Sequence, residues 1–247
     1  MIDTNPPCIA WADPPSNLSL RKDEIHVWQA YLKTDRETLC RFESTLTSDE
    51  KSRAARFLFS QDRDSFIMAR GILRDLLGRY LGRPPAAIEF EYGPHGKPAL
   101  HRKNSYLPIR FNLAHSHGRA LYAFADQREV GIDLELIRVD FGGEAVAKRF
   151  FSMREVMELR ALPQALRAQG FFICWTRKEA YVKALGGGLQ IPLNSFDVSL
   201  TSGRLEQFHA ARNLLWSLYS FQPAPQFVAA VMAEGRIRQL RYLDWAP

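Results

Sequence analysis

The feature that most constrains the fold of this sequence is a run of structural signals that occurs twice. A helical pattern over residues 64–81 ends at Gly82 and precedes the strand pattern IEFEY. A second helical pattern over residues 171–185 ends at three glycines and precedes the strand pattern FDVSL at 196–200. Because the identical residues are few and the spacings differ, chance similarity is the alternative to a true duplication. A duplication would give two pseudo-symmetric α+β halves with a ligand-binding cleft between them.

The remaining patterns extend this mixed α+β organisation over the whole chain. We expect an N-terminal half over residues 1–128 and a C-terminal half over residues 129–247, the first opening with an irregular arm up to Asn17. Further helical signals begin at Thr47 and cover residues 144–166. Further strands are predicted at residues 24–32, 107–115, 120–125, 130–137, 214–221, 227–233 and 237–243.

Composition narrows the class of protein without selecting a function. Of the 247 residues, 46% are hydrophobic, which excludes a largely disordered chain. Lys and Arg exceed Asp and Glu by 33 − 27 = 6, so the surface favours anionic partners such as nucleic acids, acidic proteins or phosphorylated small molecules. No apolar run reaches the ~18 residues of a membrane span, and the first residues do not form a secretory signal. We therefore expect a cytoplasmic protein with no membrane partner.

The segment Gly-Ile-Asp-Leu-Glu at 131–135 places two acids on one face of a predicted strand. Alternate side chains of a strand point to opposite faces, so Asp133 and Glu135 would lie together while Ile132 and Leu134 enter a core. Two neighbouring carboxylates suit Mg²⁺, which binds one or two carboxylates together with water and phosphate oxygens. An ordinary exposed strand face is the alternative, and it is the commoner explanation of such a segment taken alone.

The segment WTRKEAYVK at 175–183 aligns charged residues along one face of a predicted helix. Trp175, Glu179 and Lys183 recur every four residues and therefore share a face. In a functional interpretation Glu179 is a third metal ligand and Lys183 binds phosphate. The alternative is a Glu–Lys pair that stabilises the helix by about 0.2–0.5 kcal/mol.

Two further segments carry basic residues at positions suited to phosphate. Gly96-Lys97-Pro98 would form a rigid turn that presents the Lys97 side chain and backbone N–H groups to an anion. His115 lies at the end of the strand pattern FNLAH, where it would donate a hydrogen bond to a phosphate. Each segment taken alone is better explained as a plain turn and a partly buried histidine.

Together these motifs resemble the 4′-phosphopantetheinyl transferase superfamily, and in particular its larger, pseudo-dimeric Sfp-type branch. The similarity covers residues 46–196, and its most specific part is the combination of GIDLE with WTRKEAYVKALG. The apparent doubling also fits, since the trimeric enzymes of the superfamily have about half this length. The motifs occur in the order Gly-Lys-Pro, Phe-Asn-Leu-x-His-Ser, Gly-Ile-Asp-Leu-Glu, Arg-Phe-Phe-Ser-x-x-Glu and Trp-x-x-Lys-Glu-Ala-x-x-Lys.

The resemblance implies an enzyme that moves the phosphopantetheine arm of coenzyme A to a serine of an apo carrier protein and releases adenosine 3′,5′-bisphosphate. It implies that Asp133, Glu135 and Glu179 hold Mg²⁺ on the coenzyme A pyrophosphate, next to Lys183. It further implies that Glu155 is the general base for the serine. The coenzyme-binding residues expected by this similarity are Arg53, Lys97, Pro98, Asn112, His115, Asp133, Glu179 and Lys183, with Lys97, His115 and Arg53 assigned to phosphate and mainly to the 3′-phosphate.

One position departs from the family pattern, since Ala114 stands where a serine often precedes the motif histidine. The missing hydroxyl would remove one hydrogen bond to the 3′-phosphate, worth about 0.5–1.5 kcal/mol. The resemblance also implies acidic carrier domains, which a basic enzyme would attract. We expect them to dock near residues 153–170, on a monomer whose single chain supplies both halves.

Three other functions compete with this interpretation. A catalytically silent family member would bind carrier proteins without acting on them, but the acids and Lys183 are intact. A basic nucleic-acid-binding protein would fit the net charge, but the sequence has no recognisable binding motif. A metal-dependent nuclease would use similar acids, but it would leave Lys97 and His115 without a role.

Overall fold

The computed structural model describes residues 4–101, 109–210 and 213–247. The first part of the chain forms β1 (Glu24–Tyr31), α1 (Arg36–Thr45), α2 (Ser48–Ala54), α3 (Ser60–Leu81), β2 (Phe90–Tyr92), β3 (Pro98–Leu100), β4 (Ile109–Ser116) and β5 (Arg119–Asp126). The second part forms β6 (Val130–Leu136), α4 (Glu144–Phe150), α5 (Met153–Ala161), α6 (Gln164–Leu185), β7 (Glu206–Ala210), β8 (Leu214–Phe221), β9 (Phe227–Glu234) and β10 (Gln239–Asp244). Short 3-10 turns follow the long helices at Pro85–Ala87, Gly188–Gln190 and Leu193–Ser195.

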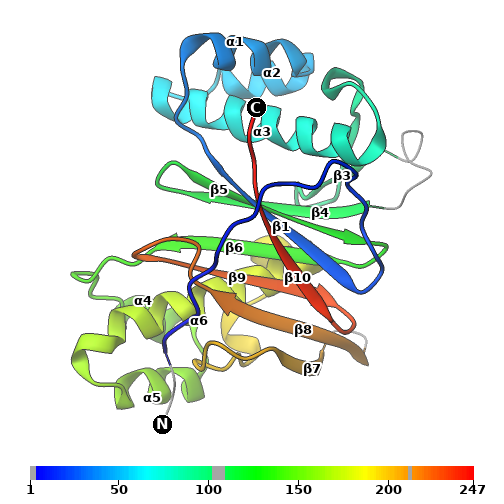
Figure 1. The fold of residues 1–247 in the computed structure, drawn as a ribbon. Helices are drawn as coiled ribbons and strands as arrows, with labels where there is room; N and C mark the ends of the chain where they lie inside the picture. The colour runs from blue at the N-terminus through cyan, green and yellow to red at the C-terminus, as the bar shows by residue number, and fades with distance from the viewer. Residues whose placement is uncertain (1–3, 102–108, 211–212) are drawn as a thin grey trace.

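Two four-stranded sheets stack on each other, and helices cover their outer faces (Figure 1). The first sheet has the strand order β10-β1-β5-β4 and packs against α1–α3 through a core that contains Trp28. The second has the order β6-β9-β8-β7 and packs against α4–α6 through a core that contains Trp216. A third apolar layer, to which β1 contributes Val27 and β6 contributes Ile132, joins the two sheets.

The two halves repeat one order of elements. The series β1-α1-α2-α3-β4-β5 corresponds to β6-α4-α5-α6-β8-β9. In the first half β5 pairs with both β1 and β4, and in the second half β9 pairs with both β6 and β8. Helices α3 and α6 both have 22 residues and both end at a glycine with positive φ, Gly82 and Gly186. The predicted α+β class is confirmed, and the shared topology favours duplication over chance similarity.

The first and last segments of the chain cross between the two halves. Strand β10 returns from the C-terminal part and pairs in parallel with β1. The N-terminal arm forms isolated bridges from Cys8 to Gln222 and from Ala12 to Leu243, and in Figure 1 it runs past both sheets. Backbone pairing therefore joins the halves in addition to the apolar layer.

The helix predicted over residues 144–166 is wrong as a single element, because it is divided into α4, α5 and the start of α6. Ser152 is the N-cap of α5 and forms a capping box with Glu155. The hydroxyl of Ser152 accepts from the amide of Glu155, and the carboxylate of Glu155 accepts from the amide of Ser152. Pro163 then precedes α6 and has no amide hydrogen to continue α5.

The strand predicted at residues 196–200 is also wrong. The amide of Val198 donates to the carboxylate of Glu155, at 2.7 Å, and not to a neighbouring strand. Three of the described helices and strands escaped prediction, namely α1, which follows the N-cap Asp35, the short strand β3, and the edge strand β7. Residues 107 and 108 of the strand predicted at 107–115 lie outside the described residues.

Helix α6 lies directly against β6 because Gly131 has no side chain. A Cβ atom at this glycine would lie 2.1 Å from the carbonyl oxygen of Ala180 and 2.4 Å from the amide nitrogen of Ala184. Asp133 shares the face of β6 that carries Gly131, whereas Ile132 enters the layer between the sheets, as the alternation of the strand predicts. The close approach therefore brings the acid of β6 next to the C-terminal turns of α6.

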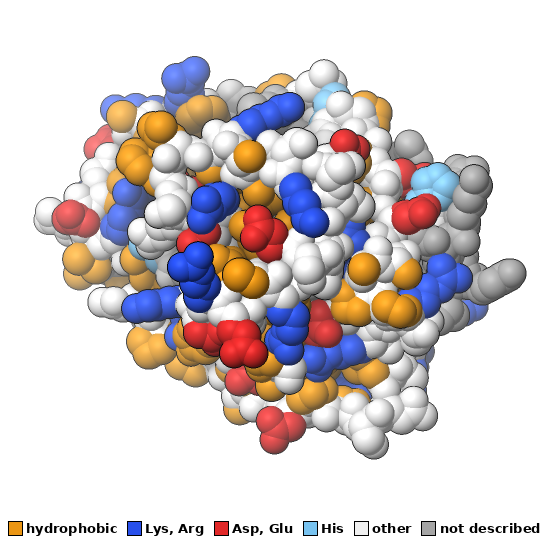
Figure 2. Space-filling model, turned by 90° about the horizontal axis from the view of Figure 1, so that it is seen from above, with side chains coloured by type: hydrophobic (Ala, Val, Ile, Leu, Met, Phe, Trp, Pro, Cys, Tyr) orange, Lys and Arg blue, Asp and Glu red, His pale blue; other side chains and the backbone are white. Residues whose placement is uncertain are grey.

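The surface formed by α1–α3 mixes charges of both signs. Figure 2 shows Lys and Arg side chains interspersed with Asp and Glu on this face, so the described residues do not gather the net charge of +6 into one basic patch there. Within the described parts of the chain, the helices are all too short or too polar to cross a bilayer.

Candidate functional site

Asp133 is the centre of the candidate site. Strand β6 holds its buried carboxylate on the face toward α6, and Oδ1 accepts a hydrogen bond from Nζ of Lys183 at 2.5 Å. The second oxygen, Oδ2, is buried and has no hydrogen-bond partner among the described residues. Burying a polar atom without a partner costs free energy. This oxygen is therefore available to a cation.

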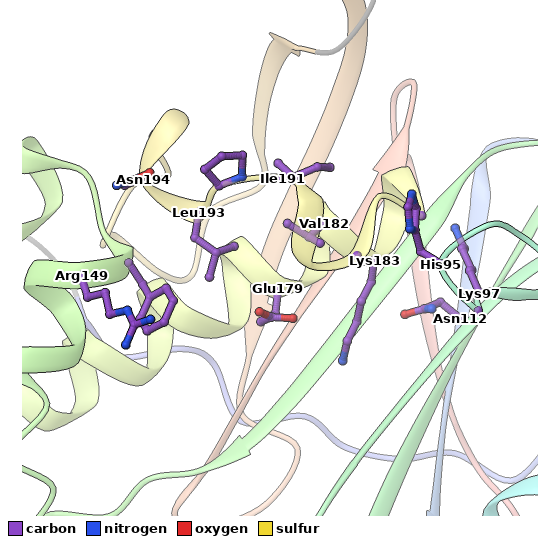
Figure 3. Close-up of a pocket in the computed structure, with 15 residues that line it drawn as sticks. His95, Lys97, Asn112, Arg149, Glu179, Val182, Lys183, Ile191, Leu193 and Asn194 are labelled. Atoms are coloured by element: carbon purple, nitrogen blue, oxygen red, sulfur yellow. The ribbon is translucent and has the colours of Figure 1, made fainter. Parts of the chain in front are cut away.

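Helix α6 contributes two further charged side chains one turn apart. Glu179 and Lys183 project from the same side of the helix into a cavity of about 540 Å³ (Figure 3). Asn112 and His95, from the first half, line the same cavity, and Arg149 lies at its opposite end. The shared face predicted from the four-residue spacing thus faces a cavity built from both halves.

The negative charge of Asp133 acts on two neighbouring carboxyl groups at this centre. Burial, and then the neighbouring charge of Asp133, raises the pKa of Glu135 to about 7. The same two causes, in the same order, raise the pKa of Glu179. The ammonium of Lys183 acts in the opposite direction on both groups. A further positive charge would relieve this repulsion and keep Glu135 and Glu179 ionised.

The donor set at this centre is compatible with a divalent cation that prefers oxygen. Among the described residues, no three or more His, Cys, Asp and Glu side chains converge closely enough to enclose a metal ion. Mg²⁺ does not require such a cage, because it commonly uses one or two carboxylates and completes its shell with water and substrate phosphate. The free Oδ2 of Asp133 and the raised pKa values of Glu135 and Glu179 fit that mode of binding.

A second, smaller cavity of about 300 Å³ adjoins the first. The two share Gly96 and Lys183 in their linings, and the smaller one is also lined by Arg53 and His115. The guanidinium of Arg53 lies 5.4 Å from the centre of the Phe66 ring. Burial, followed by the charge of Lys183, lowers the pKa of His115. A ligand that carries phosphate groups at two separate places would span the two cavities.

Lys97 and Asn112 fasten the two halves together beside the cavities. The ammonium of Lys97 donates to the carboxylate of Glu129 at 2.9 Å and to the carbonyl oxygens of Ala184 at 2.8 Å and Val130 at 3.2 Å. The side-chain carbonyl of Asn112 accepts from the amide of Ile132 at 2.9 Å. The structure therefore places Lys97 beside the cavity with its donors already engaged. Pro98, the next residue of the motif, lines the smaller cavity.

Comparison with known proteins assigns the chain to a family. The profile of the 4′-phosphopantetheinyl transferase superfamily matches residues 129–232, and that of the N-terminal region of 4′-phosphopantetheinyl transferases matches residues 29–127. The transferase HetI of Nostoc sp. is 41% identical over 225 residues, which cover 91% of this chain and 94% of HetI. The chain belongs to the 4′-phosphopantetheinyl transferase superfamily.

Two other relatives match over about two thirds of the chain. A putative 4′-phosphopantetheinyl transferase of Synechocystis sp. is 37% identical over 161 residues, which cover 65% of this chain and 65% of that protein. The transferase Sfp of Bacillus subtilis is 30% identical and covers 65% and 69%, respectively. The predicted Sfp-type branch and the predicted enzyme class, a 4′-phosphopantetheinyl transferase acting on carrier proteins, are confirmed. Enzymes of this superfamily use coenzyme A as a substrate.

Glu155 of the transferase lies outside both cavities. Its carboxylate is fully buried, and Oε2 pairs with the ammonium of Lys178 at 2.8 Å and accepts from the amide of Ser152 at 2.8 Å. Its Oε1 accepts from the amide of Val198 at 2.7 Å. Both oxygens are thus engaged within the protein, which is not the environment expected of a base that receives a proton from a substrate.

Several residues of the cavities were not singled out from the sequence. Arg149, His95 and Leu193 line the larger cavity, and the only signal for Arg149 was its place as the first residue of the motif Arg-Phe-Phe-Ser-x-x-Glu. Arg149 stacks on the ring of Phe150, which lines the cavity with it. Trp175 lies partly buried against the core of the second half and does not line a cavity with Glu179.

Ala114, the position that departs from the family pattern, lies beside the smaller cavity. Ala114 is buried in the layer between the sheets, although it also lines the smaller cavity next to His115. The neighbouring hydroxyl of Ser116 lies 3.5 Å from the carboxylate of Glu135, on the side of the acids.

Proposed function

We propose that this protein catalyses Mg²⁺-dependent transfer of the 4′-phosphopantetheine arm from coenzyme A to a serine of an apo carrier protein. The serine oxygen forms a bond to the phosphorus that carries pantetheine, and the bond from that phosphorus to adenosine 3′,5′-bisphosphate breaks. The departing phosphate oxygen of adenosine 3′,5′-bisphosphate keeps the electron pair of the broken bond, and the serine proton passes to solvent water. The observation that carries the proposal is the charged cluster at the junction of β6 and α6. Asp133 and Glu135 from β6 lie near Glu179 and Lys183 from α6, and these last two side chains line the larger cavity.

The acids and Lys183 would act on the diphosphate of coenzyme A. One or two carboxylates of the group Asp133, Glu135 and Glu179 would hold Mg²⁺ together with water and phosphate oxygens, and the bound ion would offset the charge that develops on the leaving phosphate. Lys183 would supply a fixed positive charge to the same phosphates, where preorganised electrostatics count most. Its distance of 2.5 Å from Asp133 supports this assignment, because one carboxylate holds the ammonium in place before the substrate arrives.

The smaller cavity would receive the 3′-phosphate of coenzyme A. Arg53 and His115 line it, and Lys183 lies where it joins the larger cavity. His115 would donate a hydrogen bond to the phosphate, while Arg53 would neutralise part of its charge. Asn112 and Pro98 would line the path between the two phosphate sites, and Lys97 would hold its wall through its bonds to the other half.

The carrier protein would approach over α5. Met153 and Met157, one turn apart on this helix, expose 77% and 64% of their surface, and exposed methionines suit an adaptable apolar contact. Arg149, at the end of α4, lies between this helix and the cavity. The net charge of +6 would attract an acidic carrier domain. We further propose that the protein acts as a monomer in the cytoplasm without a nucleic-acid partner, because one chain supplies both walls of the cavity.

Intact mass spectrometry of an apo carrier protein tests the proposal. After incubation with the enzyme, coenzyme A and Mg²⁺, the carrier should gain the mass of one phosphopantetheine arm, and the gain should disappear with a chelator. Glu179→Gln is the matched variant, because it keeps the shape of a cavity-lining side chain and removes its charge. A gain that persists with chelator would contradict the metal assignment. No gain with fatty-acid, polyketide or peptide carriers would favour a silent binder.

A further inference from the structure

A buried acid–base cluster occurs in the first half, between α2 and α3. The capping-box glutamate of α2, Glu50, accepts from Nε and Nη2 of Arg74 at 2.9 Å and 2.7 Å. The same guanidinium donates through Nη1 to the carbonyl oxygens of Pro85 at 3.1 Å and Ile88 at 2.7 Å. Arg74 thereby connects α2, α3 and the segment that follows α3.

The second half contains the same arrangement around Glu155. This residue is the capping-box glutamate of α5, and its carboxylate pairs with Nζ of Lys178 on α6 at 2.8 Å. The ammonium also donates to the carbonyl oxygens of Leu193 and Phe196, both at 2.6 Å. Lys178 thereby connects α5, α6 and the segment that follows α6.

The two clusters occupy equivalent positions. Arg74 lies eight residues before the terminal glycine of α3, Gly82, and Lys178 lies eight residues before the terminal glycine of α6, Gly186. Each base meets the third helical residue of the preceding short helix, in which the residue forms a capping box. The first cluster has one additional partner, since Arg70 also pairs with Glu50 at 2.8 Å. The position of the base, its pairing with the capping-box glutamate and its donation to two carbonyl oxygens of the following segment agree, so the two clusters are copies of one structural device.

The first half carries this device without carrying the acidic site. The positions on α3 that correspond to Glu179 and Lys183 are Asp75 and Arg79, which pair with each other at 2.8 Å. The carboxylate of Asp75 also accepts from the indole of Trp245 at 2.8 Å. The cluster therefore exists where the corresponding acid is closed off by a tryptophan, and its presence does not depend on proton transfer.

We propose that Glu155 and Lys178 are a positioning pair of the transferase and that Glu155 does not take the proton of the serine. This inference rests on the proposed transfer reaction. Lys178 immediately precedes Glu179, and Leu193, whose carbonyl it binds, lines the larger cavity together with Asn194. The pair thus holds the cavity wall against the helix that carries Glu179. Its effect on the reaction passes through the geometry of coenzyme A binding.

Glu155→Gln in the full-length enzyme tests the proposal, with Glu50→Gln as the matched control in the other half. We measure kcat/KM between pH 5 and 9, the dissociation constant of coenzyme A by calorimetry, and the melting temperature. Loss of one partner of a buried ion pair should lower the melting temperature of both variants by on the order of 10 °C. Glu155→Gln should also weaken coenzyme A binding several-fold and keep the wild-type pH profile.

Lys178→Arg distinguishes positioning from mere stability. Arginine occupies the equivalent position of the first half and pairs there with Glu50. Lys178→Arg should therefore keep coenzyme A affinity and kcat/KM within a few-fold of wild type, whereas Lys178→Met, which removes the partner of Glu155, should lower both. If Glu155→Gln does not fold, the double variant Glu155→Gln with Lys178→Met removes both charges, and recovery of folding with activity supports positioning.

The opposite pattern would overturn the inference. A Glu155→Gln variant, single or double, with unchanged coenzyme A affinity, a 10²–10⁴-fold lower kcat and no acidic limb in its pH profile would identify Glu155 as the base. Wild-type activity is measured in the same series. An inactive wild type would contradict the proposed function itself, while coenzyme A affinity and melting temperature would still report on the pair.

Discussion

Replacing Gly131 by alanine tests how the site is built. The added Cβ would lie 2.1 Å from the carbonyl oxygen of Ala180, whereas ordinary contact begins at 3.4 Å. The helix must therefore move away from β6 by about 3.4 − 2.1 = 1.3 Å at this point. That displacement separates Glu179 and Lys183 from Asp133, whose bond to Lys183 is 2.5 Å long.

The expected losses of stability and activity follow from this displacement. Overpacking a buried site costs about 1–3 kcal/mol, which lowers the melting temperature of a chain of this length by roughly 2–12 °C. A misplacement of about 1 Å at a reacting centre can reduce the rate by ~10²-fold. We expect Gly131→Ala to show both effects, measured by thermal unfolding and by mass gain of an apo carrier.

Gly142→Ala is the matched control for this prediction. A Cβ at Gly142 meets no atom within 4 Å, and its φ lies outside the positive range that disfavours other residues. Its melting temperature and activity should remain near those of wild type. If Gly131→Ala behaves in the same way as this control, then α6 does not lie against β6 as described and the reasoning about the site fails.

Three further predictions concern charge and pH. Asp133→Asn should lower kcat/KM for transfer at least ~100-fold with an unchanged circular dichroism spectrum, and near-normal turnover would remove Asp133 from the diphosphate site. His115→Ala should weaken coenzyme A binding about 10–100-fold but leave 3′-dephospho-coenzyme A unaffected in calorimetry; equal losses would place His115 elsewhere. Burial, and then Arg241, lowers the pKa of His26 from 6.5 to about 4, so the folded state holds it neutral. The unfolded state then binds more protons below pH 6.5, and the free energy of unfolding should fall by about 3 kcal/mol as pH drops from 6.5 to 4. Urea unfolding of wild type and His26→Gln checks this, because the variant should lose that part of the slope.

Local periodicity was sufficient to predict which of the charged side chains share a face, whereas the prediction of one acidic centre rested on the combination of motifs and the family resemblance. The two-residue repeat of a strand determines that Asp133 and Glu135 share a face, and the 3.6-residue turn of a helix determines the same for Glu179 and Lys183. Both predictions depend only on neighbours in sequence. They therefore do not require knowledge of how β6 and α6 pack against each other.

The helix boundaries between residues 144 and 166 were not predicted, although the sequence contains one signal for the start of α5. The series Ser-x-x-Glu at 152–155 is a capping box and marks the start of α5. The same residue, Glu155, also belongs to the family motif, and the resemblance implied that it is the general base for the serine. The sequence was thus compatible with two roles for one residue.

The tertiary structure decided which charged side chains are free to bind a ligand. Lys97 meets Glu129 and carbonyl oxygens of β6 and α6, and Glu155 meets Lys178, so both are engaged by partners from other elements. Lys183 and Glu179 line the larger cavity, as Lys97 does, but the ammonium of Lys97 already donates to three oxygen atoms of the protein. The physical reason is that a buried charge must be paired, and its partner is chosen by packing between segments far apart in sequence. Residue type and spacing therefore determined which charged groups the chain carries, while the fold determined which of them line a cavity and which partner each of them meets.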